Sequence, residues 1–145
     1  MTTRMKSAKT KGCDALEPDN MDAYDNGGGG FNLKSADALN YIKFLATTAH
    51  GLGLGIGLKN AGDIVKAAEP LVDFAVNEQC VQYEECARWK PFITANKAVF
   101  NVEYPVGGAR AEAAVKAKSC KSPKKFSTIL KDMDVTAPVY ICPAH

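Results

Sequence analysis

The sequence predicts an α/β fold built around a sheet of parallel strands. Five short apolar segments alternate along the chain with four segments of helical periodicity. Such alternation is typical of parallel strands joined by right-handed crossovers. Nearly every apolar segment ends in a polar or charged cluster. Because parallel strands bring their carboxyl ends to one edge of the sheet, we expect these clusters to converge there as a functional site.

The composition is that of one ordinary globular domain. Of the 145 residues, 46% are hydrophobic and 23% are charged. The net charge of +2 is small, and no basic motif with interleaved aromatic residues is present, so we expect no nucleic acid partner. The sequence contains no run of about 18 apolar residues, so we expect no membrane span. The polar start of the chain has no apolar segment after it, so we also expect no signal peptide in this chain.

The first segment, residues 1–11, is polar and basic and is followed by Gly12. It fits the end of a helix closed by that glycine or a disordered basic tail, and both interpretations stay open. The domain itself is expected over residues 12–145. Its first strand is predicted at residues 13–16, a short and mostly apolar run.

An acidic cluster follows this first strand. Glu17, Asp19 and Asp22 place three carboxylates within six positions, beside Pro18, which cannot continue a β-ladder. Crowded carboxylates repel one another, and a chain tolerates them most readily where a cationic partner or acid–base chemistry uses them. A solvated acidic turn is the alternative interpretation of this stretch.

The remaining elements follow in order. A flexible glycine loop is expected at residues 27–30, and Ser35 is the predicted N-cap of a helix that Gly51 ends. The later strands are predicted at residues 54–58, 74–76, 98–102 and 126–130. The helices between them are predicted at residues 64–71, 89–93 and 109–117. The later strand ends deliver polar clusters that begin at Lys59, Asn77, Glu103 and Lys131.

Five cysteines predict disulfides rather than a zinc site, because none forms a Cys-x-x-Cys pair. Cys80 and Cys86 bracket a short loop, and Cys120 and Cys142 flank the last strand. We expect each pair to form a disulfide, which indicates an oxidising compartment and stands in tension with the missing signal peptide. Cys13 is the odd one out, and we expect it to be a small buried side chain.

Several other motifs are assigned no chemistry. The glycines at positions 51, 53, 55 and 57 match neither the dinucleotide nor the Walker pattern, and they fit a strand inside a crowded barrel. Residues 19–25 resemble a calcium loop only superficially, and we expect neither a metal nor a cofactor. His50 and His145 are expected to be bystanders. The lysines within residues 116–125 are expected to form a solvated face.

The carboxylates remain as the candidates for chemistry. Asp19 and Glu78 follow different strands and could face each other across a barrel mouth, as the cleavage of a glycosidic bond requires. More acids are present than this chemistry needs, namely Asp22, Glu103, Asp132 and Asp134. A cationic amino sugar would explain the surplus, since its ammonium group pairs with carboxylates. An ion-pair network with Lys59 and Lys131 is the competing explanation.

Five segments resemble glycoside hydrolase family 114, the microbial endo-α-1,4-polygalactosaminidases. They are residues 12–24, 57–60, 74–80, 99–104 and 126–132. The resemblance implies a (β/α)8 barrel of the TIM type and a secreted or cell-wall hydrolase acting on α-1,4-linked galactosamine polymers such as galactosaminogalactan. It implies Asp19 and Glu78 as the catalytic pair. It also implies that the substrate-binding cleft is lined by Asp22, Tyr24, Lys59, Asn60, Asn77, Gln79, Glu103, Tyr104, Lys131 and Asp132.

The chain departs from this family in its length. A complete barrel takes about 250 residues, and residues 12–24 match the fourth strand of the family. We therefore expect a barrel truncated to about five strands, with the first three strand–helix units missing. Its exposed sheet edges would favour self-association. A non-catalytic remnant that binds amino-sugar polymers, or an inactive fragment of a longer hydrolase, are the alternatives to an active enzyme. Which carboxylate is the nucleophile and which is the acid stays open.

Overall fold

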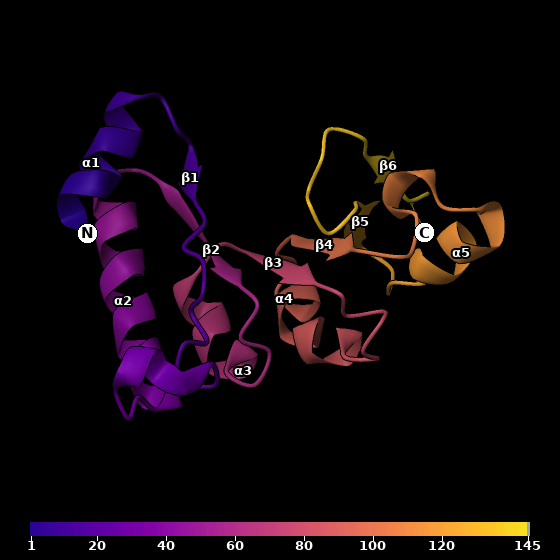
Figure 1. Cartoon of the computed structure of the whole chain (residues 1–145). Helices are drawn as coiled ribbons and strands as arrows, with labels where there is room; N and C mark the ends of the chain where they lie inside the picture. Colours follow the sequence, from indigo (N-terminus) through magenta and orange to yellow (C-terminus); the bar gives the residue numbers. More distant parts are fainter. Residues whose placement is uncertain (145) are drawn as a thin grey trace. The chain divides into compact units, whose positions relative to one another are not determined.

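The structure, a computed structural model, describes residues 1–144, so His145 lies outside the described residues. The chain forms two compact units that meet between Ala75 and Val76. This boundary lies inside strand β3 (Phe74–Glu78), which is labelled in Figure 1. Unit 1 is the part before the boundary and unit 2 is the part after it.

Unit 1 contains two parallel strands, the start of a third and the long helix α2. Its elements are α1 (Thr2–Thr10), β1 (Ala15–Leu16), η1 (Gly27–Gly30), α2 (Ser35–Gly51), β2 (Gly55–Lys59), α3 (Val65–Ala68) and η2 (Glu69–Leu71). Strand β1 pairs in parallel with β2, and Ala15 lies opposite Gly55. The backbone N–H of Asp73 donates to the carbonyl oxygen of Ile56 at 2.8 Å, which joins the start of β3 to β2.

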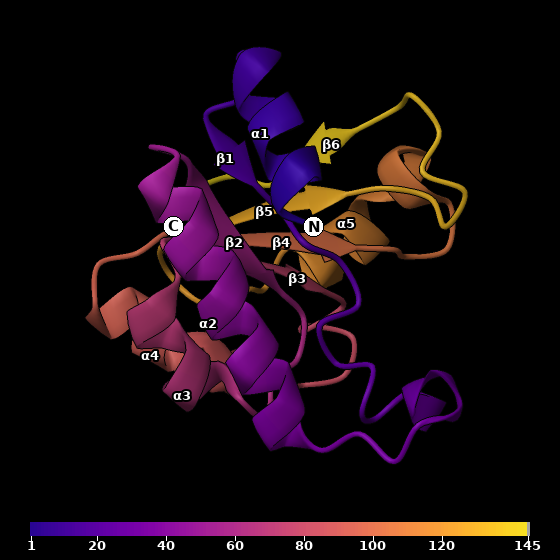
Figure 2. The same ribbon diagram turned by 90° about the vertical axis from the view of Figure 1, so that its left-hand side faces the viewer.

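Helix α2 supplies much of the core of unit 1. It packs against β2 through one buried stripe, and Figure 2 shows it lying along that strand. The stripe consists of Ile42, Leu45, Ala46 and Ala49. The predicted N-cap is wrong by one residue, because Lys34 is the N-cap and Ser35 is the first helical residue. The carboxylate of Asp37 accepts the backbone N–H of Lys34 at 2.8 Å, and this bond places the helix start.

Strand β2 requires glycine at position 57 because the ring of Phe74 lies close to its backbone. A Cβ atom added to Gly57 would lie 2.3 Å from Cε2 of Phe74, the first residue of β3. The ring of Phe74 therefore occupies the space that any other side chain at position 57 would need. This contact confirms the expectation that a small residue belongs on this crowded strand.

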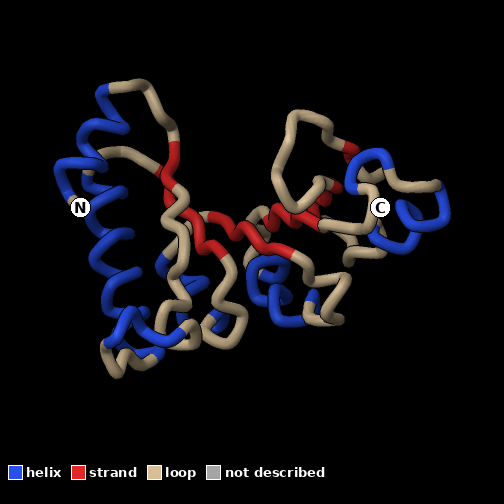
Figure 3. Tube along the Cα trace, in the orientation of Figure 1, coloured by secondary structure: helices blue, strands red, loops and turns tan. Residues whose placement is uncertain are grey.

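Unit 2 contains the end of β3 and three further strands. Its elements are η3 (Cys86–Trp89), α4 (Lys90–Thr94), β4 (Val99–Glu103), η4 (Gly108–Arg110), α5 (Ala113–Ser119), β5 (Phe126–Leu130) and β6 (Tyr140–Ile141). Strands β4 and β5 lie side by side in parallel over five residue pairs (Figure 3). The backbone N–H of Gln79 donates to the carbonyl oxygen of Val102 at 2.8 Å and joins the end of β3 to β4.

The short strand β6 was not predicted. It pairs with β5 in antiparallel orientation, so that Tyr140 lies opposite Leu130. Two residues are too few to give a periodic signal in a sequence. The sheet is therefore parallel as predicted in strands β1, β2, β4 and β5, with an antiparallel strand at one edge of unit 2.

The two faces of the sheet in unit 2 differ in burial. Val99, Asn101 and Glu103 are buried on one face, whereas Phe100 is 44% exposed on the other. Side chains alternate between faces along a strand, so this pattern continues to the strand ends. Tyr104 belongs to the more open face, directly after a residue of the buried one.

Both predicted disulfides are present. Cys80 bonds to Cys86 across six residues, and Cys120 bonds to Cys142. The expectation that Cys13 is buried is wrong: it is exposed and free, because it precedes β1 rather than lying inside it. Among residues 1–144, no helix is long and apolar enough to cross a membrane.

Candidate active site

In unit 1, the candidate carboxylate is Asp19, which follows β1. The Nζ atom of Lys59, the last residue of β2, lies 3.2 Å from Oδ1 of Asp19. The same oxygen accepts the backbone N–H of Asn20 at 2.9 Å. The Lys59 side chain is 12% exposed and that of Asp19 is 64% exposed. A largely buried cation thus orients a carboxylate that stays open to solvent.

Tyr24 and Asp63 form a second polar contact in unit 1. The Tyr24 hydroxyl donates to Oδ1 of Asp63. Burial is the main cause that raises the pKa of Tyr24 above its ordinary value, and the hydrogen bond and charge of Asp63 add to it, with smaller contributions from Asp22 and Asp25. Tyr24 therefore stays a neutral donor. Asn60, expected in the cleft, lies directly after β2 at a left-handed turn with φ 52°.

In unit 2, the candidate carboxylate is Glu78, the last residue of β3. The hydroxyl of Tyr104 donates to Oε1 of Glu78 at 2.5 Å. Gln79 follows in the left-handed region with φ 63°, and its side-chain amide donates to Oε1 of Gln82 at 2.9 Å. The structure thus brings the predicted residues Glu78 and Tyr104 into direct contact.

Two other predicted residues, Asn77 and Glu103, lie on the buried face of unit 2. They are 3% and 2% exposed. The Glu103 carboxylate accepts the backbone N–H groups of Val81 and Gln82 at 2.8 and 3.2 Å. The side chain of Asn77 donates to Oδ1 of Asn101. Both side chains therefore bind other protein groups on the buried face of the sheet.

Lys131 and Asp132 follow β5, and both form hydrogen bonds to Thr136 in the turn after that strand. Oδ1 of Asp132 accepts the backbone N–H of Thr136 at 2.9 Å, its other oxygen accepts the Thr136 hydroxyl, and Lys131 donates to the Thr136 carbonyl oxygen. The two bonds from Thr136, with smaller contributions from Lys131 and Arg110, lower the pKa of Asp132. Asp132 is therefore a carboxylate held by its own loop.

Comparison with known proteins identifies the family of the chain. A family model described as glycoside-hydrolase family GH114 matches residues 1–145. The chain belongs to this family. The match confirms the family that the five sequence segments resembled.

A solved structure has the same fold. The chain is similar to the crystal structure of Aspergillus fumigatus Ega3 in complex with galactosamine, with 39% sequence identity and a TM-score of 0.91. The match covers 98% of this chain and 59% of the Ega3 chain, so the chain spans 59% of the length of that protein. No curated protein matches the chain. The predicted α/β class is confirmed.

Sequence reasoning missed several residues of this GH114 chain. Asp63 and Thr136 were not singled out, although each bonds to a predicted site residue. Asn101 and Thr128 were missed as well, and both are buried polar residues within strands. The available signal for these two was a polar residue in the middle of an otherwise mostly apolar strand, because a buried polar side chain needs a hydrogen-bond partner.

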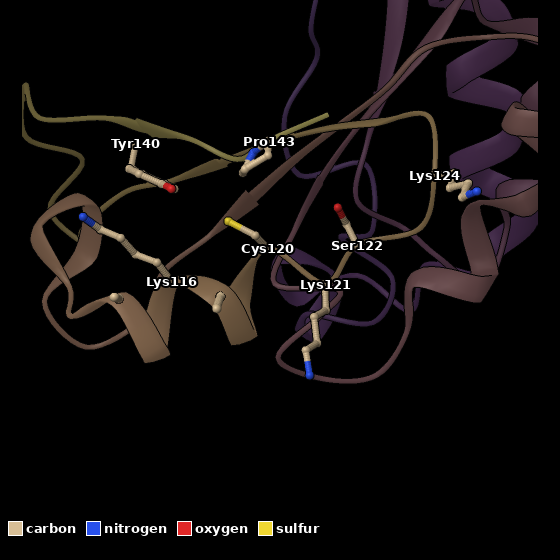
Figure 4. Close-up of a pocket in the computed structure, with 9 residues that line it drawn as sticks. Lys116, Cys120, Lys121, Ser122, Lys124, Tyr140 and Pro143 are labelled. Atoms are coloured by element: carbon tan, nitrogen blue, oxygen red, sulfur yellow. The ribbon is translucent and has the colours of Figure 1, made fainter. Parts of the chain in front are cut away.

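A cavity of about 860 Å³ in unit 2 has none of the candidate residues of that unit in its lining. Ser122 and Lys124, in its lining, precede β5, whereas Glu78, Tyr104 and Lys131 lie at the carboxyl ends of their strands. Figure 4 shows the Lys116 amine directed at Tyr140, and the distance from Nζ to the ring centroid is 4.5 Å. Lys121 and Lys124 are exposed, as expected for a solvated face.

The structure places His50 away from the candidate carboxylates of unit 1. Its Nε2 atom lies 2.9 Å from Oδ2 of Asp73, and the same oxygen accepts the backbone N–H of Ile56 at 2.8 Å. His50 therefore supports the amino ends of β2 and β3. Within the described residues, no group of three or more His, Cys, Asp and Glu side chains could hold a metal ion.

The contact between Tyr24 and Asp63 predicts a pH effect on stability. Folding raises the pKa of Tyr24 above its ordinary value of 10.0, so the unfolded chain loses this proton first as the pH rises. The stability contributed by neutral Tyr24 is present below pH 10.0 and is lost above it. We expect the free energy of unfolding to fall more steeply above this pH for the protein than for Tyr24→Phe.

Urea denaturation at a series of pH values measures this difference. Both proteins should carry Cys13→Ser, because Cys13 is a free and exposed cysteine and thiol–disulfide exchange would complicate the measurement at alkaline pH. The two curves should run parallel at neutral pH. Equal slopes above pH 10 would show that Tyr24 has the same pKa in the folded and unfolded chains.

Proposed function

We propose that this chain is a glycoside hydrolase domain that cleaves α-1,4-linked galactosamine polymers of the galactosaminogalactan type. Asp19 and Glu78 are its two catalytic carboxylates. One observation carries the proposal: each lies at or just after the carboxyl end of a strand, where Lys59 contacts Asp19 and Tyr104 contacts Glu78. Membership of family GH114 and the galactosamine in the Ega3 crystal support it.

The chemistry needs two carboxyl groups in different roles. One protonates the oxygen of the leaving sugar, and the other attacks the anomeric carbon or activates a water molecule. Lys59 and Tyr104 hold the carboxylates in place, which lowers the entropic part of the barrier. The anomeric configuration of the first product, read by NMR, assigns a retaining or an inverting course.

The acidic residues of unit 1 fit a cationic substrate. Asp19, Asp22 and Asp63 lie close in sequence to the ends of β1 and β2, and the ammonium group of galactosamine pairs with such carboxylates. The Tyr24 hydroxyl donates its proton to Asp63, and its oxygen can accept a hydrogen bond from a sugar hydroxyl. The proposed substrate contacts beyond the catalytic pair are Asp22, Tyr24, Lys59, Asn60, Gln79, Tyr104, Lys131 and Asp132.

The chain-length distribution of a soluble α-1,4-galactosamine oligomer tests this function. The oligomer is incubated with the purified 145-residue protein, and circular dichroism shows that the protein is folded. We expect the oligomer to be shortened. An intact oligomer that still binds the folded protein would reject hydrolysis by this chain and would favour the amino-sugar-binding remnant.

The disulfides and the surface lead to two further proposals. Two disulfides fit a protein of an oxidising compartment, and we propose that it is secreted. Apolar side chains are exposed on and before the edge strand β6 of unit 2, namely Met133, Val135, Val139 and Ile141. We propose that they support self-association, which sedimentation velocity over a range of concentrations would show.

A further inference from the structure

We infer that Glu103 is a positioning residue that acts through the loop after Glu78 and not through the substrate. Its carboxylate holds that loop from the buried side of the sheet. The inference rests on the proposed role of Glu78 and assigns Glu103 a task other than lining the cleft.

The loop after Glu78 is closed on itself and held at its first turn. The disulfide between Cys80 and Cys86 joins its ends, and Cys80 is 1% exposed. Within this ring, Oε1 of Glu103 accepts the N–H of Val81 at 2.8 Å, and Oε2 accepts the N–H of Gln82 at 3.2 Å. The two oxygens of one carboxylate therefore bind two consecutive amides. Such bonds to an ionised acceptor are stronger than those between neutral groups.

A buried polar network holds Glu103 in turn. The side-chain amide of Asn101 donates to Oε1 of Glu103 at 3.1 Å and lies 3.4 Å from Oγ1 of Thr128. Asn77 donates to Oδ1 of Asn101. The network crosses from β3 to β4 and β5, and each of these side chains is at most 4% exposed. The carboxylate is thus anchored to three strands at once.

Glu103 and its neighbour Tyr104 act on opposite faces of the same strand end. Tyr104 binds the Glu78 carboxylate at 2.5 Å, whereas Glu103 binds the loop that begins directly after Glu78. Between them, the N–H of Gln79 bonds to the carbonyl oxygen of Val102. Glu78 is therefore held through its side chain by Tyr104 and through its following backbone by Glu103. Small displacements of a catalytic group lower rates strongly, so loosening this loop should impair catalysis.

Burial argues against direct contact between Glu103 and a substrate. The side chain is 2% exposed, and three N–H donors already bind its oxygens. A buried carboxylate that lost these donors would carry an uncompensated charge. The Glu103 carboxylate has hydrogen-bond donors from the protein itself, which is typical of a residue that positions active-site groups without binding the substrate.

Two variants separate positioning from charge. Glu103→Gln replaces one acceptor oxygen by a donor that cannot bind an amide N–H, and Glu103→Asp keeps the charge but is one methylene too short. We expect both to raise hydrogen exchange at the Val81 and Gln82 amides of the 145-residue chain by at least about 10-fold. We expect kcat on the galactosamine oligomer to fall by about 10- to 100-fold, with KM changed by less than about 3-fold.

Thr128→Val is the matched control. Thr128 belongs to the same buried network through Asn101 and Ser122, but no bond joins it to the loop. The control should lower the stability of the fold without selectively raising exchange at Val81 and Gln82. Because Glu103 keeps its three N–H donors in this variant, kcat should fall much less than in the Glu103 variants, which separates loss of the loop contact from a general loss of packing.

Two results would overturn the inference. The first is unchanged exchange at Val81 and Gln82 in both Glu103 variants. The second is a raised KM with normal kcat in Glu103→Gln and wild-type kinetics in Glu103→Asp, because this pattern would assign Glu103 a charge contact with the substrate. If the wild-type chain cleaves no oligomer, the proposed function fails, and exchange at the two amides still decides whether Glu103 holds the loop.

Discussion

Glu78→Gln and Asp19→Asn are each expected to lower the rate of galactosamine oligomer cleavage by about 10²- to 10⁴-fold. Both changes keep the size of the side chain but remove its ability to exchange a proton or attack carbon. Because Asp19 is largely exposed and Glu78 is held by Tyr104, neither change should unfold the chain. The measurement is the initial rate of product formation by chromatography, with thermal unfolding of each variant as the check on folding.

Matched controls exist in the same segments. Glu17→Gln removes an exposed carboxylate from the segment after β1, and Glu84→Gln removes one from the loop after β3. Both should keep the wild-type rate. Tyr104→Phe removes only the hydrogen bond to Glu78 and should cost about 10-fold, the equivalent of one ordinary hydrogen bond. Full activity in Asp19→Asn or Glu78→Gln would reject that residue as a catalytic group.

Gly57→Ala is expected to lower the free energy of unfolding by about 1–3 kcal/mol. The added Cβ would lie 2.3 Å from Cε2 and 2.7 Å from Cζ of Phe74, so the ring and the two strands must shift. These atoms belong to a rigid ring on the neighbouring strand, and small-to-large changes in such places force off-rotamer side chains. Urea denaturation followed by circular dichroism measures the loss.

A control and a rescue make this prediction specific. Gly51→Ala, at the end of α2, meets no atom within 4 Å and should leave stability unchanged or slightly raised. Phe74→Leu removes part of the ring and should recover much of the loss in the Gly57→Ala background, although it costs stability by itself. This non-additivity measures the coupling between the two positions. A Gly57→Ala protein as stable as the wild type would contradict the close approach.

The amino-acid sequence alone determined the order and type of most elements. The strand predicted at residues 126–130 matches β5, and both disulfides follow from the spacing of four cysteines around short segments. These features are local, since the apolar period and the turn residues on either side report on a single element. The segments that carry the family resemblance are also local, and the family match confirms them.

Only the tertiary structure decided which side chains act together. Glu103 and Tyr104 are adjacent in sequence, and both were expected in the cleft. Glu103 is instead buried on one face of the sheet, whereas Tyr104 binds Glu78. Tyr24 meets Asp63 across 39 positions of sequence. The antiparallel strand β6 depends on its pairing with β5 rather than on its two residues. A sequence pattern encodes the period of an element but not its partner, because pairing and burial arise from contacts between segments far apart in the chain.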